Sequence, residues 1–325
     1  MKIAIIGYGL IGEKRSKALG NNELVIVADK DNDRTRRISE INPSTKVTAA
    51  WQEAVEHPTV DIVIVSTTND WLAPISLHAL NHGKHVIVEK PAARTPEELE
   101  PLVNKILSSE YKVKVGFNLR YHPAIKKAKE ISDSGVLGNL MFIRGRYGHG
   151  GRIGYEQEWR ADSKISGGGE LMDQGIHLID LSRWFLGEFK TVKGTVETYY
   201  WDMPVEDNAF LALRTEKGQT AWLHASCSEW KNLFCLEIYG QYGKLQIDGL
   251  GGSYGIERLT YYKMLPEMGP PETTIWEYPG ADTSWESEFG AFVNSIKDRA
   301  PLCGDLNDAY QALQIIKKIY GGKYE

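Results

Sequence analysis

The sequence predicts an α/β domain with a doubly wound parallel sheet, followed by an α+β domain with a large, mostly antiparallel open sheet. In the N-terminal part, short β-branched apolar runs alternate with helical stretches, which is the βαβ pattern of a parallel sheet. From Asn139 onward, strand-like runs follow one another through tight, glycine-containing turns, as in antiparallel sheets. A glycine-rich turn between the first strand and the first helix completes the pattern of a nucleotide-binding α/β domain.

The expected strands of the N-terminal part are short and rich in Val and Ile, so helices should cover both of their faces. Helical stretches separate these strands, and each helix returns the chain to the start of the next parallel strand. We expect strands at residues 2–7, 23–29, 60–67, 85–89 and 112–118, and helices at residues 10–19, 73–82 and 96–108.

The C-terminal part has longer strands, and turns at residues 216–218 and 241–243 are of the kind that close hairpins. A helix at residues 169–186 interrupts the strands. The last helix, at residues 306–320, begins after the N-cap residue Asp305 and ends at Gly321 and Gly322. We expect strands at residues 140–147, 191–201, 209–215, 219–226, 233–239 and 244–247.

The chain has 325 residues, which is more than one hydrophobic core usually supports, so two domains are expected. We place a dinucleotide-binding domain at residues 1–120 and a substrate-binding and oligomerisation domain at residues 121–325. The C-terminal helix at residues 305–320 is a candidate to pack back on the first domain.

Composition argues against several classes of protein. The formal net charge of -5 gives no clustered basic surface for nucleic acid or an anionic membrane. The three cysteines show no spacing typical of a metal site or a disulfide framework, so we expect no metal and a reducing compartment. No stretch has the length of a membrane span or the pattern of a signal peptide, so we expect a cytoplasmic protein.

The first strand turns into the first helix through Gly7-Tyr8-Gly9-Leu10-Ile11-Gly12, the fingerprint of a Rossmann dinucleotide-binding domain. The first glycine permits the tight turn, and the second lets the backbone approach a pyrophosphate. The third permits close packing of helix on strand. The pyrophosphate would then meet the free amides at the positive end of the helix dipole.

Asp29 ends the second strand, at the position where an acidic residue accepts hydrogen bonds from the adenosine ribose. Its carboxylate would repel a 2′-phosphate by about 4 kcal/mol per unit charge at ~4 Å and an effective dielectric constant of ~20. NAD is therefore favoured over NADP. Lys30, a further candidate contact of the cofactor, and Arg34 leave this preference open, because a nearby cation offsets the repulsion.

Asp173 and His177 are four residues apart in an expected helix, so both side chains should share one face. Three glycines, at positions 167–169, directly precede this segment. Because glycine lets the backbone approach a ligand closely, we expect this face to line a ligand-binding cleft.

These segments, taken in order, resemble the Gfo/Idh/MocA family of oxidoreductases, which includes glucose-fructose oxidoreductase and inositol dehydrogenases. The resemblance covers essentially the whole chain. Its motifs are Gly7 to Gly12, Glu89-Lys90-Pro91, Asn118-Leu119-Arg120 leading to Pro123, Trp159-Arg160, and the segment from Gly167 to Asp180.

The resemblance implies that Lys90, Asp173 and His177 form a catalytic group beside the nicotinamide. Oxidation of a secondary alcohol needs a base for the hydroxyl proton, and His177 has a suitable ordinary pKa. We assign His177 as base, Asp173 as the residue that orients it or a second substrate hydroxyl, and Lys90 as proton relay and polariser of the oxygen, although relatives divide the base role differently between lysine and histidine. The resemblance further implies a cis bond before Pro91.

The resemblance also implies further contacts of the cofactor and the substrate. Many relatives have a histidine where Leu72 stands here, in a loop that passes close to the cofactor. The expected additional cofactor contacts are Thr67, Thr68, Asn69, Glu89, Lys90 and Asn118. The expected substrate contacts are Lys90, Arg120, Tyr121, Trp159, Arg160, Asp173 and His177, with Arg152 and Tyr155, and also His149, from a glycine-rich loop.

Aromatic faces and bidentate polar groups suit a polyhydroxylated ring, so we expect a sugar, a sugar derivative or a cyclic polyol as substrate. Several arginines would also accommodate a nucleotide-linked sugar. The resemblance and an exposed sheet face predict a homodimer or homotetramer that forms through the C-terminal sheet.

Two alternatives stay open. One is a glycosidase whose tightly held NAD oxidises the sugar transiently. The other is a non-catalytic dinucleotide-binding sensor of a metabolite, although the presence of Lys90, Asp173 and His177 argues against it.

Overall fold

The computed structural model describes residues 1–322 and divides them into two compact units. Unit 1 comprises Met1–Phe117 together with Trp285–Leu313, and unit 2 comprises Asn118–Ser284 together with the chain from Gln314 onward. The domain boundary expected at residue 120 and the expected roles of the two domains remain predictions. The last three residues of the second one, 323–325, lie outside the described residues.

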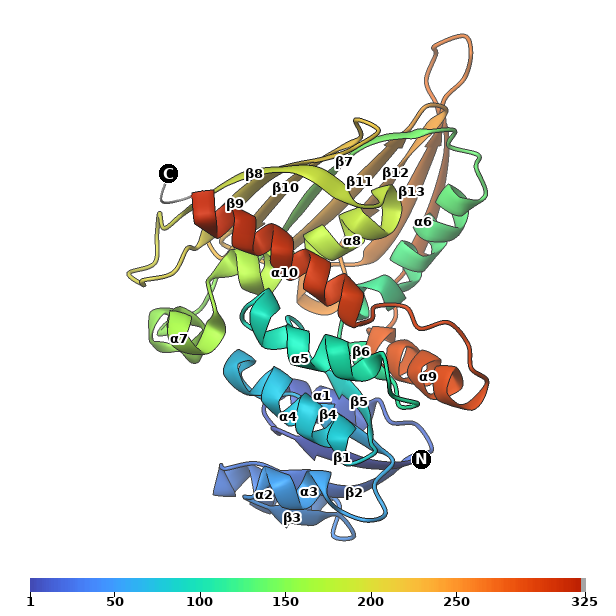
Figure 1. Cartoon of the computed structure of the whole chain (residues 1–325). Coiled ribbons are helices and arrows are strands. Elements are labelled where there is room, and N and C mark those ends of the chain that lie inside the picture. The colour runs from blue at the N-terminus through green and yellow to red at the C-terminus, as the bar shows by residue number, and fades with distance from the viewer. Residues whose placement is uncertain (323–325) are drawn as a thin grey trace. The chain divides into compact units, whose positions relative to one another are not determined.

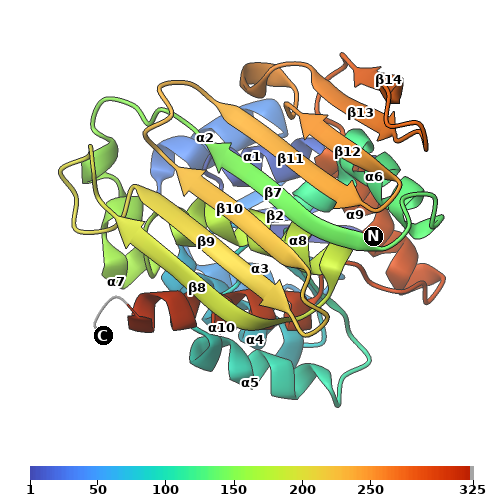
Figure 2. The same cartoon turned by 90° about the horizontal axis from the view of Figure 1, so that it is seen from above.

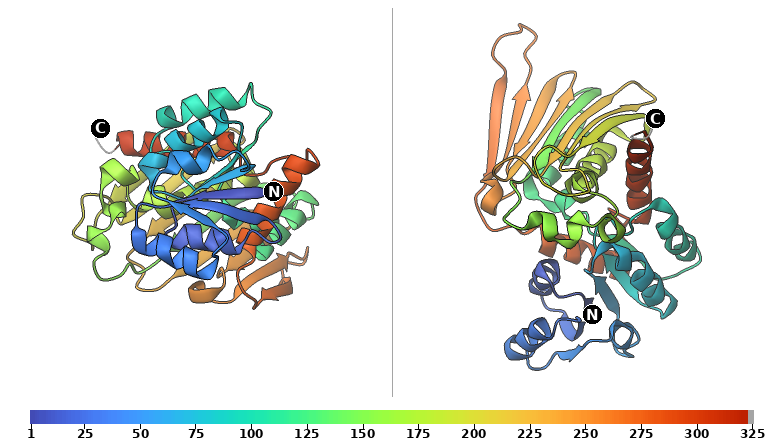
Figure 3. Two further views of the ribbon diagram at one scale, coloured as in Figure 1. Left: turned by 90° about the horizontal axis from the view of Figure 1, so that it is seen from below. Right: turned by 90° about the vertical axis from the view of Figure 1, so that its left-hand side faces the viewer.

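Unit 1 contains a six-stranded sheet in the order β3-β2-β1-β4-β5-β6, and each strand pairs parallel with its neighbours. Helices lie on both sides of the fan of strands (Figure 3, left). The strands are β1 (Lys2–Ile6), β2 (Glu23–Ala28), β3 (Lys46–Thr48), β4 (Ile62–Val65), β5 (His85–Val88) and β6 (Val113–Val115). The helices are α1 (Leu10–Lys17), α2 (Asn32–Ile41), α3 (Trp51–Val55), α4 (Asn69–Asn81), α5 (Pro96–Ile106) and α9 (Ser284–Lys297).

The core of unit 1 explains why its strands are nearly all Val and Ile. All four residues of β4 are buried, as expected for a central strand covered on both faces. The cluster around Ile5 and Ile64 also includes Phe289 and Phe292, which come from α9 late in the sequence. The returning segment therefore supplies part of the hydrophobic core of unit 1.

Unit 2 contains an eight-stranded sheet in the order β14-β13-β12-β11-β7-β10-β9-β8. Its pairs are antiparallel except for β7 and β10, which lie side by side and run parallel. The strands are β7 (Leu140–Gly148), β8 (Phe189–Glu197), β9 (Asn208–Thr215), β10 (Thr220–Ser226), β11 (Leu233–Gly240), β12 (Gly243–Asp248), β13 (Glu257–Lys263) and β14 (Glu272–Tyr278). The expected doubly wound sheet and large, mostly antiparallel sheet are both confirmed.

Helices cover one face of this sheet. α6 (Pro123–Asp133) packs on β12, β13 and β14, and α8 (Ile176–Leu186) packs on β7 and β10 (Figure 1). The other face points away from these helices (Figure 2). Phe210 and Trp222 are exposed there, so this face carries large apolar side chains in contact with solvent.

Several elements differ from the expectations. The helix expected at residues 169–186 begins as a π-helical turn at Leu171–Gly175, which continues directly into α8. α4 begins at Asn69 instead of residue 73. Elements that were not predicted include α2, β3, α3, β13, β14 and α9. β14 reads Glu-Thr-Thr-Ile-Trp-Glu-Tyr, without a regular alternation of apolar and polar residues, so its sequence gave little signal of a strand. Helix α10 (Leu306–Gly321) lies where it was expected.

Within residues 1–322, the helices are all too short or too polar to cross a lipid bilayer.

Candidate active site

The dinucleotide turn of unit 1 can only be made by glycine at two positions. Gly7 has φ +84°, and a Cβ there would lie 2.6 Å from the carbonyl oxygen of Ser66. A Cβ at Gly12 would lie 2.1 Å from the carbonyl oxygen of Gly7. At Gly9, in contrast, the atom nearest to an added Cβ would be Nη1 of Arg34, at 3.6 Å. Protein atoms thus fill the space beside Gly7 and Gly12, whereas the space beside Gly9 is open, as a pyrophosphate at the start of α1 requires.

Asp29 lies directly beside this turn. The amide of Tyr8 donates to Oδ2 of Asp29 at 2.6 Å, and the amide of Asp31 donates to Oδ1 at 2.9 Å. Arg34 approaches the same carboxylate, with Nη1 3.3 Å from Oδ2. The guanidinium partly neutralises the charge that would repel a 2′-phosphate, so the preference for NAD is weaker than Asp29 alone would give. Lys30 lies over the ring of Trp71, with Nζ 5.3 Å from the centroid.

The loop after β4 and the segment after β5 contain the other expected cofactor contacts. Ser66 donates from Oγ to the carbonyl oxygen of Gly7 at 2.7 Å, which ties this loop to the dinucleotide turn. Thr67 and Thr68 follow, and Asn69 begins α4. Leu72, where the resemblance implied a histidine, is fully buried.

The Glu89-Lys90-Pro91 segment ends β5, and the Lys90–Pro91 bond is cis, as the resemblance implied. The carboxylate of Glu89 is paired with a buried arginine. Its Oε1 lies 2.6 Å from Nε of buried Arg15, whose Nη1 lies 2.5 Å from Oε2 of Glu288. Burial opposes the charge on Arg15, but the two carboxylates outweigh it and raise the pKa of this guanidinium. We infer that Glu89 positions the segment through Arg15. Its contact with the cofactor remains a prediction that this ion pair does not support.

In unit 2, the π-helical turn and the start of α8 carry Asp173 and His177. Both residues lie on the continuous helical segment, and His177 is buried beside the ring of Tyr147, at a centroid distance of 5.9 Å. A π turn is rare and wider than an α turn, and such turns occur mostly at functional sites. The sequence spacing predicted an ordinary α-helix here, so the widened turn at Asp173 was not foreseen.

Two of the glycines before this turn make close contacts within unit 2. A Cβ at Gly168 would lie 2.0 Å from the Tyr320 hydroxyl, and a Cβ at Gly169 would lie 2.0 Å from the carbonyl oxygen of Glu206. The backbone therefore approaches other parts of unit 2 at these positions. These contacts account for the two glycines without a ligand, and a close approach of the backbone to a ligand remains a prediction.

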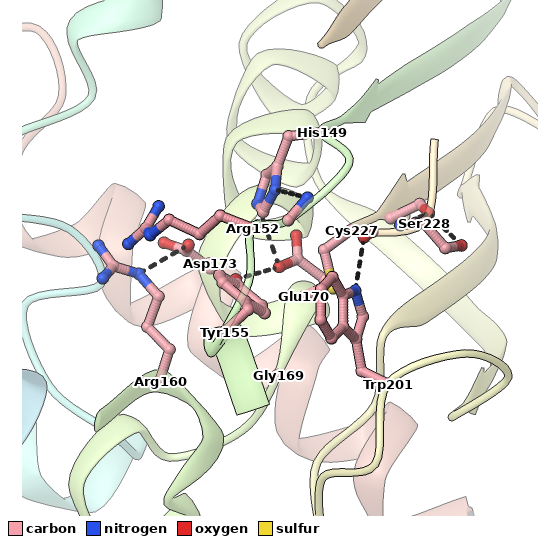
Figure 4. Close-up of polar contacts among 12 residues, drawn as sticks. His149, Arg152, Tyr155, Arg160, Gly169, Glu170, Asp173, Trp201, Cys227 and Ser228 are labelled. Carbon is pink, nitrogen blue, oxygen red and sulfur yellow. Dashed lines mark hydrogen bonds and ion pairs between the residues drawn. The ribbon is translucent and has the colours of Figure 1, made fainter. Parts of the chain in front are cut away.

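A cluster of polar side chains gathers beside Asp173 (Figure 4). The Tyr155 hydroxyl donates to Oε1 of Glu170 at 2.8 Å, and Nε2 of His149 lies 3.4 Å from the same oxygen. Nε of Arg160 lies 3.3 Å from Oδ2 of Asp173. The structure thus brings together four residues that the sequence predicted as site residues, with Glu170, which it did not predict. The four are His149, Tyr155, Arg160 and Asp173.

The charges of this cluster follow from its burial and its neighbours. Burial favours the neutral phenol and, together with Glu170, raises the pKa of Tyr155. Burial opposes a cationic imidazole, but Glu170 outweighs this effect and raises the pKa of His149 above its ordinary value of 6.5. Burial also opposes a charged Arg160, yet Asp173 outweighs it and raises the pKa of that guanidinium. The cluster therefore contains a neutral phenol and a firmly cationic guanidinium.

His149, Glu170 and Asp173 bring three possible metal ligands within 4.8 Å of one another. The amide of Gly151 donates to Nδ1 of His149 at 3.0 Å. This bond leaves the proton of a neutral ring on Nε2, which faces Glu170, whereas a metal at Nε2 would need the opposite tautomer. The cluster is thus better suited to hydrogen bonding than to metal coordination.

Comparison with known proteins identifies the family. Residues 1–117 match the oxidoreductase family with an NAD-binding Rossmann fold, and residues 125–246 match the GFO/IDH/MocA C-terminal domain. The chain belongs to the Gfo/Idh/MocA family.

Among members of this family, the chain is 29% identical to levoglucosan dehydrogenase of Pseudarthrobacter phenanthrenivorans over 67% of its own length and 59% of that relative. It is 24% identical to D-glucoside 3-dehydrogenase of Escherichia coli over 98% of its length and 94% of that enzyme. A solved structure of levoglucosan dehydrogenase in complex with NADH and L-sorbose superposes with a TM-score of 0.88. At 22% identity, covering 99% of this chain and 96% of that one, this likeness establishes the fold.

Other residues of this Gfo/Idh/MocA chain that were predicted to contact substrate or cofactor are buried and bonded within unit 2. Arg120 is buried, and its Nε and Nη2 donate to Asp180 at 2.8 and 2.6 Å. Asn118 donates from Nδ2 to the Ser284 hydroxyl at 3.0 Å, and Tyr121 is buried. These bonds give Arg120 and Asn118 positioning roles within unit 2, and their contacts with substrate and cofactor remain predictions.

The glycine-rich loop of this Gfo/Idh/MocA chain holds the remaining predicted residues. Arg152 is exposed and bonds from Nη2 to Oε2 of Glu158 at 2.6 Å. The Arg160 guanidinium lies over the ring of Trp159, 4.6 Å from its centroid. Trp201 was not predicted, and its Nε1 donates to the carbonyl oxygen of Cys227 at 2.8 Å beside the cluster. Nothing in the spacing of Trp201 or Glu170 in the sequence marks either residue as part of a site.

Proposed function

We propose that this protein is an NAD(P)-dependent dehydrogenase that oxidises a secondary alcohol of a sugar, a sugar derivative or a cyclic polyol. The observation that carries the proposal is the joint placement of Asp173, His177 and Arg160 in unit 2 of a chain whose unit 1 has an open dinucleotide turn. In the reaction, the C–H bond of the carbinol breaks and its hydride passes to the nicotinamide. The hydroxyl proton leaves to a base, and the products are a ketone and NADH.

Among the side chains of this chain, we assign the proton to His177 or Lys90. His177 has an imidazole suited to accept a proton near neutral pH. Asp173, held by Arg160, would orient the substrate hydroxyl or the imidazole. Lys90 would polarise the alcohol oxygen and relay the proton. Which of Lys90 and His177 is the first acceptor is part of the test below.

The nicotinamide cofactor accepts the hydride when bound, and we propose NAD in preference to NADP. The dinucleotide turn would hold the pyrophosphate, and Asp29 would accept hydrogen bonds from the ribose hydroxyls. The turn comprises Gly7, Tyr8, Gly9, Leu10, Ile11 and Gly12. The support is the open space in front of Gly9 and the carboxylate of Asp29 beside the turn. Arg34 moderates the preference because it already neutralises part of that charge.

The substrate class rests on the cluster beside Asp173 and on the relatives. Tyr155 and His149 present hydrogen-bonding groups beside aromatic rings, an arrangement that suits a hydroxylated ring. The related levoglucosan dehydrogenase and D-glucoside 3-dehydrogenase are named for sugar derivatives, which supports the same class for this chain.

We also propose that residues 1–120 bind the cofactor and that residues 121–325 bind substrate and carry the oligomer contact. The uncovered face of the unit 2 sheet, with exposed Phe210 and Trp222, supports a homodimer or homotetramer that forms there. A cytoplasmic location fits a small-molecule enzyme that uses a nicotinamide cofactor.

The test is the appearance of NADH with a panel of sugars, inositols, amino sugars, anhydro sugars and nucleotide sugars, measured with NAD and with NADP. Turnover with at least one compound is the expected result. A glycosidase would instead release an aglycone from a glycoside with no net NADH. A metabolite sensor would bind NAD tightly and turn over none of the panel.

A further inference from the structure

A second group of possible metal ligands lies in unit 1, where α3 and α4 end. His78 and His82 are four residues apart at the C-terminal end of α4, so their rings lie on one face of that helix. Glu56 caps the C-terminal end of α3. Nε2 of His78 lies 2.8 Å from Oε1 of Glu56, so the two helix ends are in contact here.

We propose that Glu56, His78 and His82 form a divalent transition-metal site, with Zn²⁺ as the best-suited ion. Imidazole nitrogen and carboxylate oxygen are the ligand types that zinc takes in proteins. Two histidines at i and i+4 on a helix are a common way to present two of these ligands to one ion. Water would complete the coordination, because all three side chains are partly exposed.

The distances fit such a site after small side-chain rotations. Nε2 of His82 lies 3.9 Å from Oε1 of Glu56, and the three donor atoms all lie within 4.8 Å of one another. In a tetrahedral site with bonds of ~2.0 Å, ligand atoms are about 3.3 Å apart, so the His82–Glu56 pair would approach by about 0.6 Å and the His78–Glu56 pair, at 2.8 Å, would separate by about 0.5 Å. Such movements need no change in the backbone of either helix.

The orientation of His82 is the observation that points most directly to a metal. Its Nδ1 lies 2.8 Å from the carbonyl oxygen of His78, and a carbonyl can only accept, so the ring proton is on Nδ1. In the neutral ring, Nε2 therefore carries a lone pair and faces Glu56. Histidine ligands of metals typically donate the proton of their other ring nitrogen to a carbonyl or a carboxylate in this way. His78 differs: its Nε2 lies 2.8 Å from Oε1 of Glu56, and a carboxylate can only accept, so a bound ion would displace the proton on that nitrogen.

The surroundings of the site favour a cation. Both helices present their C-terminal ends here, and the negative end of a helix dipole stabilises positive charge. The His78 ring packs edge-on against Trp51, at a centroid distance of 5.1 Å, and lies 4.2 Å from the ring of His82. These contacts restrict the imidazole before any ion arrives, which lowers the entropy lost on binding. The bound ion would tie the end of α3 to the end of α4.

The test uses the full-length protein without a polyhistidine tag, stripped with a chelator and titrated with Zn²⁺ alone by calorimetry. One ion per chain is expected. Loss of even an outer-shell partner of a zinc ligand costs about 10–100-fold in affinity, so His78→Ala, His82→Ala and Glu56→Gln should each weaken binding at least tenfold. The matched control is His57→Ala, which removes the neighbouring histidine, whose Nδ1 faces the hydroxyl of Thr59.

Two further measurements do not depend on enzyme activity. Zn²⁺ should raise the melting temperature of the wild type and not that of His82→Ala. Co²⁺ should give the visible absorption of a tetrahedral site in the wild type only. The proposal is overturned if the three ligand variants bind Zn²⁺ like the wild type, or if His57→Ala loses as much affinity. It is also overturned if Cys303→Ser abolishes binding, or if one ion binds per two chains.

Discussion

The Tyr320 hydroxyl donates to Oε1 of Glu206 at 2.7 Å, and this contact joins the end of α10 to the start of the π-helical turn that carries Asp173. The same oxygen accepts from the amides of Gly169 and Leu171, both at 3.1 Å. One buried carboxylate oxygen thus collects three donors, two of which are backbone groups directly before Asp173. We infer that the position of Asp173 depends on this carboxylate.

Removing the Tyr320 hydroxyl should destabilise the protein. A hydrogen bond to a charged group contributes about 1.5–3 kcal/mol, so Tyr320→Phe should lower the free energy of unfolding by about that amount. Urea unfolding followed by fluorescence measures this change. Tyr310→Phe on the same helix is the control, because that hydroxyl bonds at the surface to Glu100, at 3.2 Å. Equal effects of the two substitutions would show that the Glu206 contact has no special weight.

Gly169→Ala should destabilise the protein more than an ordinary glycine substitution. The new Cβ would lie 2.0 Å from the carbonyl oxygen of Glu206, and backbone atoms cannot move away as a flexible side chain can. Overpacking of this kind costs about 1–3 kcal/mol or more. Gly290→Ala in α9 is the matched control, since its Cβ would meet no atom of the described chain within 4 Å. Improved helix propensity should make that variant slightly more stable, by up to about 1 kcal/mol.

Substitution of Lys90 or His177 should affect catalysis and leave cofactor binding intact. Lys90→Met and His177→Ala should each lower turnover by roughly 10²–10⁴, the usual contribution of general acid–base catalysis. NAD affinity, measured by fluorescence titration, serves as the internal control and should stay nearly constant. Near-normal turnover in either variant would remove that residue from the proposed mechanism and favour a metabolite sensor.

Cofactor preference should depend on Asp29 and Arg34 together. NAD should bind at least about tenfold more tightly than NADP, since one unit of repulsion at this position exceeds 1.4 kcal/mol. Asp29→Ser should narrow that difference, because the repulsion disappears while Arg34 loses its carboxylate partner. Asp29→Ser combined with Arg34→Ala should bind NADP less well than Asp29→Ser alone. Tighter NADP binding by the wild type would contradict the assignment.

The contact between His149 and Glu170 should make stability depend on pH. Burial lowers and Glu170 raises the pKa of His149, and the net result lies above 6.5. A pKa that is raised in the folded state stabilises the protein below the unfolded value, and this stabilisation disappears as pH rises through the folded value. The wild type should therefore exceed His149→Gln in stability by more at about pH 5.5 than at about pH 8.5.

The opposing interaction in this case is the amide of Gly151, which donates to Nδ1 and must turn away when the ring is protonated. A difference between wild type and His149→Gln that does not change with pH would mean that this amide keeps the ring neutral. Urea unfolding at the two pH values separates the outcomes.

The sequence predicted features that depend on local pattern. The strands of unit 1 were recognisable because β-branched runs alternate with helices, and the dinucleotide turn was recognisable because Gly7 and Gly12 have backbone positions that only glycine tolerates. The helix that carries Asp173 and His177 was also located, because its apolar side repeats at helical spacing.

Features that depend on contacts between distant residues could not be predicted. Glu170 meets Tyr155 and His149 only after the chain folds, and Glu206 lies far along the chain from Gly169, the residue whose conformation it explains. The π-helical turn adds one residue to a helical turn without any change in the apolar pattern. The partner of His78, Glu56, likewise comes from another helix.

The late return of the chain into unit 1 has a consequence for synthesis on the ribosome. Phe289 and Phe292 complete the core around Ile5 and Ile64, yet they are translated long after the strands that they cover. The nascent N-terminal half therefore keeps part of its apolar core surface exposed while the large sheet of unit 2 is translated. Chaperones that bind exposed apolar segments would find their target in that interval, and a fragment ending at residue 117 would keep the exposed surface permanently.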